Sequence, residues 1–175
     1  MSNTKTVHVP HLGGIEAAYQ MPHAYDAKKP TLVLVNSFTT SSELYRSQYA
    51  NKALNDAMNL IAFELLGHGQ TRTQAENFTY WDTAIMNVQV LEALGMTGAG
   101  KKVFVLGTSQ GGWITVRMAL VAPDKVGSSS TLPLYFRSAL PVRFGDPSLA
   151  RVFCDRTDMR RLPQHSQVES LLGRR

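Results

Sequence analysis

The residues best suited to chemistry lie in one short stretch, Gly107-Thr108-Ser109-Gln110-Gly111-Gly112, which matches the pattern G-x-S-x-G. An apolar segment precedes this stretch and a helix-forming segment follows it, so we expect Ser109 in a sharp strand-to-helix turn. Such a turn strains the backbone of the serine, and glycines two positions to either side leave it room. The turn would present the Ser109 hydroxyl near a helix N-terminus, where the helix dipole favours developing negative charge. The pattern therefore predicts a nucleophilic serine, and the alternative is a glycine-rich turn with an incidental serine.

A serine hydroxyl needs a neighbouring base, and a group that orients the base, before it becomes a useful nucleophile. Downstream of Ser109 there is one histidine, His165, and Asp146, Asp155 and Asp158 precede it. The order serine, acid, histidine is therefore present, which makes His165 the candidate base. The interval between residues 109 and 165 shows no further strand–helix units. We therefore favour the interpretation that His165 is incidental in a weakly structured tail.

Alternating apolar and amphipathic segments predict the framework that carries Ser109. Predicted strands cover residues 5–9, 15–20, 31–35, 58–63 and 102–107, and predicted helices cover residues 39–55, 79–94 and 110–122. The first two strands flank a glycine turn and indicate a hairpin. The later strands are continuous apolar runs, which is typical of strands buried on both faces of a parallel sheet. Strands that alternate with helices of about 10–15 residues predict an α/β fold with a mostly parallel sheet.

The helix predicted over residues 79–94 has clear boundary signals. Thr79 is a suitable N-cap, and Gly95 stands where a left-handed C-terminal residue belongs. Residues of one apolar face recur at intervals of three to four positions, which is helical spacing. They are Trp81, Ile85, Val88, Leu91 and Leu94.

After Val126 the pattern changes. A further buried strand is due, but the chain continues as Gly127-Ser128-Ser129-Ser130-Thr131-Leu132-Pro133, and from there to the end it contains arginine but no lysine. We therefore divide the chain into residues 1–126, an ordered domain, and residues 127–175, a basic, poorly ordered tail. An altered coding sequence, such as a frameshift or a splice product, is the favoured explanation of the tail. A genuine divergent C-terminal segment is the alternative.

Composition excludes several classes of protein. The chain has 175 residues, 43% of them hydrophobic and 18% charged, with one cysteine and a net charge of +5. One cysteine builds no disulfide framework, and no cysteine–histidine spacing resembles a zinc site. No apolar run reaches the roughly 18 residues that span a membrane, and the N-terminus does not resemble a secretory signal. The arginines of the tail are too scattered to predict nucleic-acid binding. Neither a phosphate loop nor a dinucleotide fingerprint is present, so we expect no cofactor and no metal.

Three segments, together with the serine turn at residues 107–112, resemble the α/β-hydrolase family over residues 5–126. Residues 32–38 look like its strand and loop that usually end in His-Gly, residues 61–71 like the next strand and a Gly-His-Gly loop, and residues 122–126 like the end of the helix after the serine turn. The resemblance implies a truncated α/β-hydrolase fold: a mostly parallel sheet with an N-terminal hairpin and an irregular C-terminal tail. It implies that Ser109 is the nucleophile and that the backbone N–H groups of Phe38 and Gln110 form the oxyanion hole. The chain departs from the family at Asn36-Ser37, which stand in place of His-Gly.

The other histidines and Glu64 have structural interpretations. The family has a histidine at the position of His68 for structural reasons, and its triad order is serine, acid, histidine, so His68 is not expected to be the base. Glu64 lies where the family often has a structural aspartate. We expect His8, His11 and His23 at the surface.

The residues and the resemblance together predict a serine hydrolase of esterase or thioesterase type, acting on a small, fairly apolar metabolite. A serine excludes the covalent aspartate mechanism of epoxide hydrolases and haloalkane dehalogenases of this fold. The chain also resembles fungal hydrolases of secondary-metabolite clusters, including those for Alternaria polyketide toxins, which implies a role in toxin biosynthesis. We expect a cytoplasmic location, with the peroxisome as the alternative if the native C-terminus is missing. The alternatives for function are an inactive hydrolase remnant that serves in interactions and a binding module without turnover.

Overall fold

A mixed sheet of seven strands forms the centre of the computed structural model, which describes residues 4–98 and 100–132. The strand order is β1-β2-β4-β3-β6-β7, and β5 pairs with β2 beside this path. The bounds are β1 Thr4–Val9, β2 Ile15–Gln20, β3 Thr31–Val35, β4 Asn59–Phe63, β5 Arg72–Thr73, β6 Val103–Thr108 and β7 Val126–Leu132. All described residues belong to one compact unit. The predicted α/β-hydrolase fold, with a mostly parallel sheet and an N-terminal hairpin, is confirmed.

The hairpin and the parallel strands follow from their side-chain patterns. β1 and β2 pair antiparallel from Thr4↔Gln20 to Val9↔Ile15, and β3 pairs in parallel with β4 on one side and with β6 on the other. Every residue of β3 and β4 is buried. Burial on both faces explains why these strands read as continuous apolar runs in the sequence.

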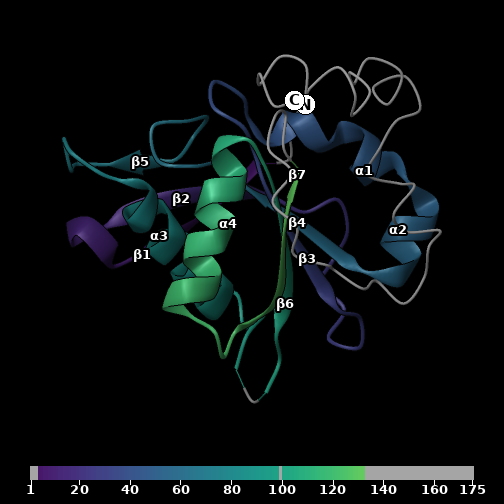
Figure 1. The fold of residues 1–175 in the computed structure, drawn as a ribbon. Coiled ribbons are helices and arrows are strands. Elements are labelled where there is room, and N and C mark those ends of the chain that lie inside the picture. Colours follow the sequence, from purple (N-terminus) through teal and green to yellow (C-terminus); the bar gives the residue numbers. More distant parts are fainter. Residues whose placement is uncertain (1–3, 99, 133–175) are drawn as a thin grey trace, which may run out of the picture. The chain divides into compact units, whose positions relative to one another are not determined.

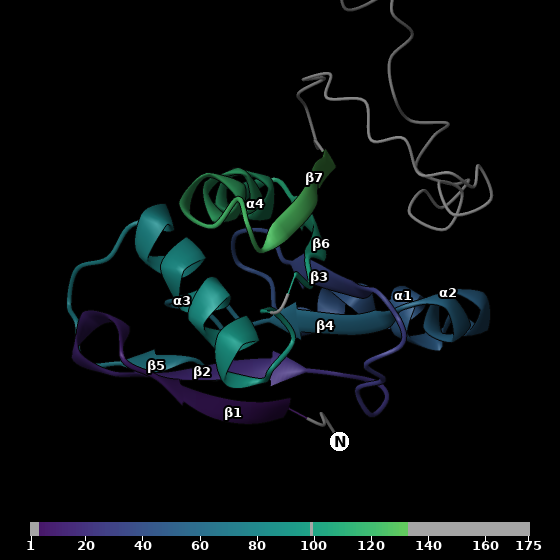
Figure 2. The same cartoon turned by 90° about the horizontal axis from the view of Figure 1, so that it is seen from below.

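Helices cover the two faces of the sheet. α3, Tyr80–Ala93, and α4, Gln110–Val121, pack together on one face, whereas α1, Arg46–Ala50, and α2, Lys52–Ala57, lie on the other (Figures 1 and 2). No helix among the described residues is long and apolar enough to cross a membrane. The layered arrangement buries Ile114 and Met118 of α4 completely against the sheet and α3.

The prediction of one continuous helix over residues 39–55 is wrong. The segment forms a 3₁₀ turn over Ser42–Tyr45, then α1, then α2. Asn51 separates the two α-helices because its backbone is extended, with φ −79° and ψ 106°, and its side chain accepts a hydrogen bond from the Leu54 N–H. An asparagine at this place thus ends one helix and caps the next.

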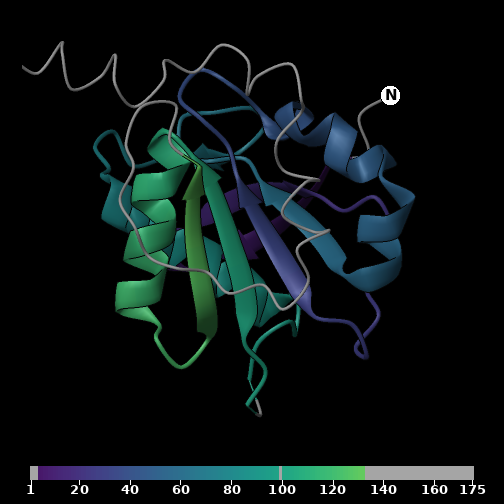
Figure 3. The ribbon, with the colours of Figure 1, turned by 45° about the vertical axis from the view of Figure 1, so that its right-hand side comes forward.

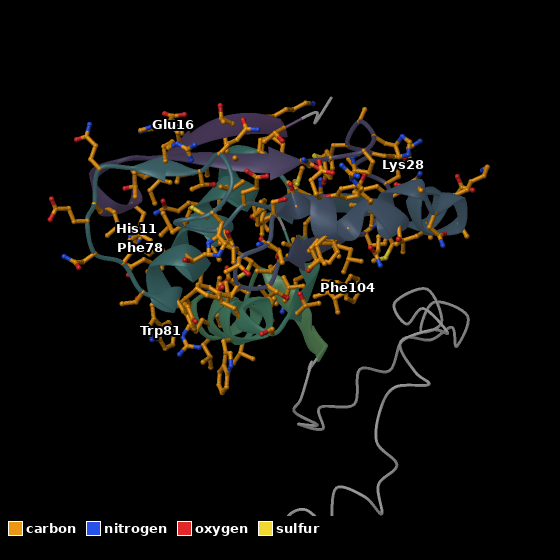
Figure 4. The ribbon with its side chains drawn as sticks, turned by 90° about the horizontal axis from the view of Figure 1, so that it is seen from above. His11, Glu16, Lys28, Phe78, Trp81 and Phe104 are labelled. Carbon is orange, nitrogen blue, oxygen red and sulfur yellow. The ribbon has the colours of Figure 1, made fainter. Side chains whose placement is uncertain are left out.

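The boundaries of α3 are as predicted, and of its predicted apolar face Val88 and Leu91 are buried, Ile85 and Leu94 are partly buried and Trp81 is exposed. Thr79 and Asp82 form a reciprocal capping box, and Gly95 has a φ of +66°. Trp81, predicted on the apolar face, is 43% exposed and points away from the sheet toward α4 (Figure 4). The buried residues of α3 are Thr83, Ala84, Met86, Asn87, Val88, Val90 and Leu91. The buried residues thus begin at Thr83, and Trp81, at the start of the helix, lies outside the core.

His11 is not a simple surface residue. Its Nε2 lies 2.9 Å from Oδ1 of Asp82, its backbone N–H donates to Oε1 of Gln89 at 3.1 Å, and its side chain is 20% exposed (Figure 4). The prediction of a surface position is therefore wrong for His11, whereas His8 and His23 are exposed. His11 joins the turn after β1 to the N-terminal cap of α3.

β7 is a strand in the stretch where the sequence pattern fails. Residues Val126–Leu132 pair in parallel with β6, with a register shift near Val103. Hydrogen bonds between backbones form this pairing, so it needs no apolar alternation in the side chains. The sheet thus extends past residue 126. The division of the chain into a domain and a tail remains a prediction, because most of residues 127–175 lie outside the described residues.

Candidate active site

Ser109 occupies a strained turn between β6 and α4. Its φ of +50° and ψ of −115° are rare for a residue with a Cβ, and it is exposed. The strand β6 runs to the edge of the sheet where the parallel strands end, and α4 begins there (Figure 3). The Gly112 N–H donates to the Ser109 carbonyl oxygen at 2.9 Å, which closes the first helical turn. This geometry presents the side chain of Ser109 at the N-terminus of α4.

The two glycines of the G-x-S-x-G pattern are required by backbone crowding. A Cβ at Gly107 would lie 2.3 Å from the carbonyl carbon of Gly111, and a Cβ at Gly111 would lie 2.1 Å from the carbonyl oxygen of Val35. Neither neighbour is a side chain that could move aside. The spacing of the glycines thus reflects the close contact of the turn with itself and with β3.

The two backbone N–H groups predicted to form the oxyanion hole have no hydrogen-bond acceptor among the described residues. Gln110 is the first residue of α4, so its N–H has no acceptor within the helix. Phe38 lies in the loop after β3, and its N–H makes no hydrogen bond within the described part of the chain. Val35 pairs with Gly107 in the β3–β6 register. Phe38 and Gln110 each lie three residues after these partners, so both follow the carboxyl ends of neighbouring parallel strands. The predicted donor pair is therefore sterically reasonable, although its role stays a prediction.

A β-turn over residues 37–40 carries Phe38. The Thr40 N–H donates to the Ser37 carbonyl oxygen at 3.3 Å, and Thr39, the third residue, has a φ of +59°. A positive φ at the third position alone is the arrangement of a type II turn. Phe38 is 65% exposed.

Asn36 and Ser37 hold this turn at the position where the family usually has His-Gly. Asn36 is fully buried, and its Nδ2 donates to the carbonyl oxygens of Thr40 at 2.7 Å and Ser37 at 3.1 Å. Oγ of Ser37 lies 2.8 Å from Oγ1 of Thr108, the residue before Ser109. The departure from the family pattern thus comes with its own hydrogen bonds, and these tie the turn to the end of β6.

Glu64 has a structural position, as its place in the sequence suggested. It is buried, its Oε1 accepts from Oγ of Ser42 at 2.9 Å, and its Oε2 accepts from the Gln70 N–H at 2.5 Å. A Cβ at Gly69 would lie 2.0 Å from the same Oε2. Buried carboxylates are stable when donors of this kind surround them. Glu64 therefore fixes the conformation of the Gly67-His68-Gly69 loop.

That loop places His68 against the turn with Phe38. His68 Nδ1 lies 3.0 Å from the Leu66 carbonyl oxygen, and the Thr39 N–H lies 3.3 Å from His68 Nε2. The rings of Phe38 and His68 meet edge to face, with centroids 5.9 Å apart and an angle of 72°. Both ring nitrogens of His68 thus contact backbone groups.

Tyr45 holds the end of β3, directly before the turn that carries Phe38. Its hydroxyl donates to the Val35 carbonyl oxygen at 2.7 Å, and burial raises the pKa of Tyr45 well above its ordinary value. The hydroxyl therefore stays protonated and remains a donor. This contact fixes the carbonyl group against which Gly111 packs.

The residues that would complete a triad lie outside the described part of the chain. These are His165 and the three aspartates Asp146, Asp155 and Asp158. Between Ser109 and residue 132 there is no histidine, and the single carboxylate side chain, Asp124, follows α4 and lies 3.6 Å from Nζ of Lys125. No three His, Cys, Asp or Glu side chains gather as a metal site within residues 4–98 and 100–132.

Sequence reasoning missed the contacts that tie these loops together. The hydrogen bond between Ser37 and Thr108 joins segments 71 residues apart in the sequence, and Asn36 Nδ2 closes the turn locally through Ser37 and Thr40. The one available signal was the departure Asn36-Ser37 itself, because two polar side chains directly after a buried strand need partners.

A family model described as the α/β-hydrolase fold matches residues 30–132. A probable hydrolytic enzyme from Pseudomonas aeruginosa matches with 18% identity and a TM-score of 0.64, over 76% of this chain and 42% of its own. A structure reported with carboxylesterases of the thaumarchaeon Nitrososphaera gargenis matches with 23% identity and a TM-score of 0.62, over 73% of this chain and 44% of its own. An epoxide hydrolase from an endophytic Streptomyces matches with 21% identity and a TM-score of 0.59, over 78% of this chain and 39% of its own. No curated protein matches the chain in sequence. The chain spans less than half the length of these three solved structures.

Proposed function

The chain belongs to the α/β-hydrolase fold family, and on that basis we propose that it is a serine hydrolase of esterase or thioesterase type. The observation that carries the proposal is the backbone of Ser109, held at a φ of +50° between β6 and α4. Strained residues of this kind persist where the surrounding structure fixes them, and they gather at active sites. The fold is shared by hydrolases of different chemistry, so the choice of ester over epoxide rests on the serine itself.

The proposed reaction begins with attack of Ser109 Oγ on the carbonyl carbon of an ester or thioester. The base takes the hydroxyl proton, and the N–H groups of Phe38 and Gln110 donate to the resulting oxyanion. The tetrahedral intermediate expels the alcohol or thiol, which receives that proton, and an acyl-enzyme remains. Water then attacks the acyl-enzyme by the same route and releases the acid. Loss of one oxyanion donor typically costs about 10²–10³ in rate.

The proposal requires a base, and its one candidate after Ser109 is His165, with Asp146, Asp155 or Asp158 as partner in the family's order of serine, acid and histidine. The alternative interpretation, that His165 is incidental, would leave Ser109 without this base. The proposed substrate is a small, fairly apolar metabolite. The exposed Phe38 ring beside the proposed oxyanion hole supports an apolar acyl or alcohol group. The resemblance to fungal hydrolases of secondary-metabolite clusters supports a substrate from secondary metabolism and a role in toxin biosynthesis.

A catalytically inactive hydrolase-like protein, acting through binding or interactions, is the second candidate. One observation favours it: within residues 4–98 and 100–132 no histidine follows Ser109, and both nitrogens of His68 contact backbone groups.

Covalent labelling with a fluorophosphonate separates the two candidates. The proposal expects the folded, full-length chain to be labelled, Ser109→Ala to abolish labelling, and the control Ser47→Ala on α1 to leave it unchanged. His165→Ala then tests the base. A chain that unfolds cooperatively but takes no label would instead support the inactive protein.

A further inference from the structure

We propose that His68 is a positioning residue that fixes the turn carrying the Phe38 N–H, and that it does so as the neutral Nδ1–H tautomer. This inference rests on the proposed function in one respect: it gives the Phe38 amide its role in the oxyanion hole. The arrangement itself is a property of the folded chain and can be tested without turnover.

The two hydrogen bonds of His68 determine its tautomer. The Leu66 carbonyl oxygen can only accept, so His68 Nδ1, 3.0 Å away, must carry the proton. The Thr39 N–H can only donate, so His68 Nε2, 3.3 Å away, must offer its lone pair. The Nδ1–H tautomer satisfies both contacts. In the Nε2–H tautomer and in the imidazolium, Nε2 carries a proton and cannot accept the hydrogen bond from the Thr39 N–H. In this arrangement the lone pair that a general base would use is already occupied.

The Thr39 N–H belongs to the central peptide group of the turn, which is the group most able to flip. Flipping that peptide converts a type II turn to a type I turn and brings the third residue to a negative φ. Thr39 has a β-branched side chain and a φ of +59°, so its own conformational preference favours the flip. Some contact outside the turn must therefore hold the peptide in place.

The contacts at the two ends of the turn cannot do this. Asn36 Nδ2 binds the carbonyl oxygens of Ser37 and Thr40, and the Thr40 N–H binds the Ser37 carbonyl oxygen. These groups lie outside the central peptide and are the same in both turn types. Among the described residues, the central N–H has one partner, Nε2 of His68. His68 thus selects the type II form, and the ring of Phe38 packs on it edge to face.

The loop that presents His68 is itself rigid. Glu64 is 3% exposed and binds the Gln70 N–H, and Gly69 fits beneath it where a Cβ would lie 2.0 Å from Oε2. The connection runs from a buried carboxylate, through a histidine in one defined tautomer, to the amide group of the turn.

Nuclear magnetic resonance of the full chain tests the arrangement directly. We expect long-range ¹H–¹⁵N spectra at neutral pH to show the Nδ1–H tautomer for His68. His68→Phe keeps a ring beside Phe38 but removes both nitrogens, so the Thr39 amide should lose its hydrogen-bonded shift and the Phe38 and Thr39 signals should move. His68→Gln places an amide oxygen at the reach of Nε2 and should restore most of that change. The exposed His23→Phe is the control and should leave these signals in place. An Nε2–H tautomer, or a Thr39 amide that does not move in the folded His68→Phe variant, would overturn the inference.

Reactivity tests the positioning role. If Ser109 takes the fluorophosphonate, His68→Phe should slow labelling by about tenfold, because the oxyanion donor is misplaced but not removed. His68→Gln should recover most of the rate, and ester hydrolysis should lose kcat with little change in KM. Unchanged labelling alongside a displaced turn would refute the positioning role. If wild-type Ser109 takes no label, the proposed function fails, and the spectra alone decide whether His68 holds the turn.

Discussion

Gly111 of α4 packs so closely on Val35 of β3 that a Cβ at residue 111 would lie 2.1 Å from the Val35 carbonyl oxygen. That oxygen is itself held by the Tyr45 hydroxyl at 2.7 Å. The helix after the serine turn and the neighbouring strand therefore meet backbone to backbone. The turn depends on this contact for its position above the sheet.

Gly111→Ala is expected to lower the free energy of unfolding by about 3 kcal/mol or more, because neither backbone can move aside without disturbing the sheet. Urea unfolding followed by circular dichroism measures this. Gly95→Ala is the matched control, since Gly95 has a positive φ but open space around it, and it should cost about 1 kcal/mol. A cost at Gly111 no greater than that at Gly95 would show that the contact with Val35 can relax and does not fix the helix on the strand.

The hydrogen bond between Ser37 and Thr108 is expected to couple the turn of Phe38 to the end of β6. Ser37→Ala and Thr108→Val should each destabilise the chain by about 1 kcal/mol, and the double variant should cost less than their sum. A double-mutant cycle in urea measures the coupling, expected at about 0.5–1.5 kcal/mol. Strict additivity would mean that the 2.8 Å contact contributes nothing to stability.

Local signals in the sequence were enough for much of the fold. The apolar runs over residues 31–35 and 103–107 identify buried strands because both faces are covered. Thr79 and Gly95 mark the ends of α3 because capping and left-handed residues act within one helical turn. The turn at Ser109 could be placed because its glycine spacing expresses a local steric need.

The remaining features depend on partners far away in the sequence. β7 pairs with β6 through its backbone, so its serines gave no strand signal. His11 meets Asp82, and Ser37 meets Thr108, across intervals that no periodic pattern spans. Trp81 looked like a core residue because its spacing fits a helix face. It lies at the start of α3, outside the core.

Arg117 explains why Trp81 can remain outside the core. Its guanidinium carbon lies 5.0 Å from the ring centre of Trp81, 5.7 Å from that of Tyr80 and 6.0 Å from that of Trp113. Its Nη1 also donates to the Trp113 carbonyl oxygen at 2.9 Å. The side chain thus joins the first turn of α3 to the first turn of α4, directly after Ser109.

Arg117→Leu is expected to lower the free energy of unfolding by about 1–2 kcal/mol, because it removes contacts between a partly desolvated cation and three aromatic rings. Tryptophan fluorescence during urea unfolding follows both the stability and the environment of Trp81 and Trp113. The control is Arg46→Leu, whose side chain is 79% exposed and pairs with Glu43, and it should change stability by less than about 0.5 kcal/mol. Similar effects of the two substitutions would argue against a specific role of the aromatic cluster.

The cap of α3 should make stability depend on pH through Asp82. Burial alone would raise the pKa of Asp82. Hydrogen bonds from the Thr79 hydroxyl and N–H, together with His11, outweigh burial and hold the pKa below its ordinary value of 3.8. Because the folded pKa is the lower one, the carboxylate contributes its full stability above pH 3.8. The contribution is lost as the pH falls through the folded pKa.

We therefore expect Asp82→Asn to be clearly less stable than the wild type at pH 6, and the difference to shrink as the pH is lowered toward 3. Thermal or urea unfolding at several pH values measures this difference. Glu76→Gln, at an exposed position after β5, provides the control for the general effect of removing a carboxylate. A difference between wild type and Asp82→Asn that stays constant from pH 6 to pH 3 would mean that the charge of Asp82 does not stabilise the cap, and that its hydrogen bonds act without it.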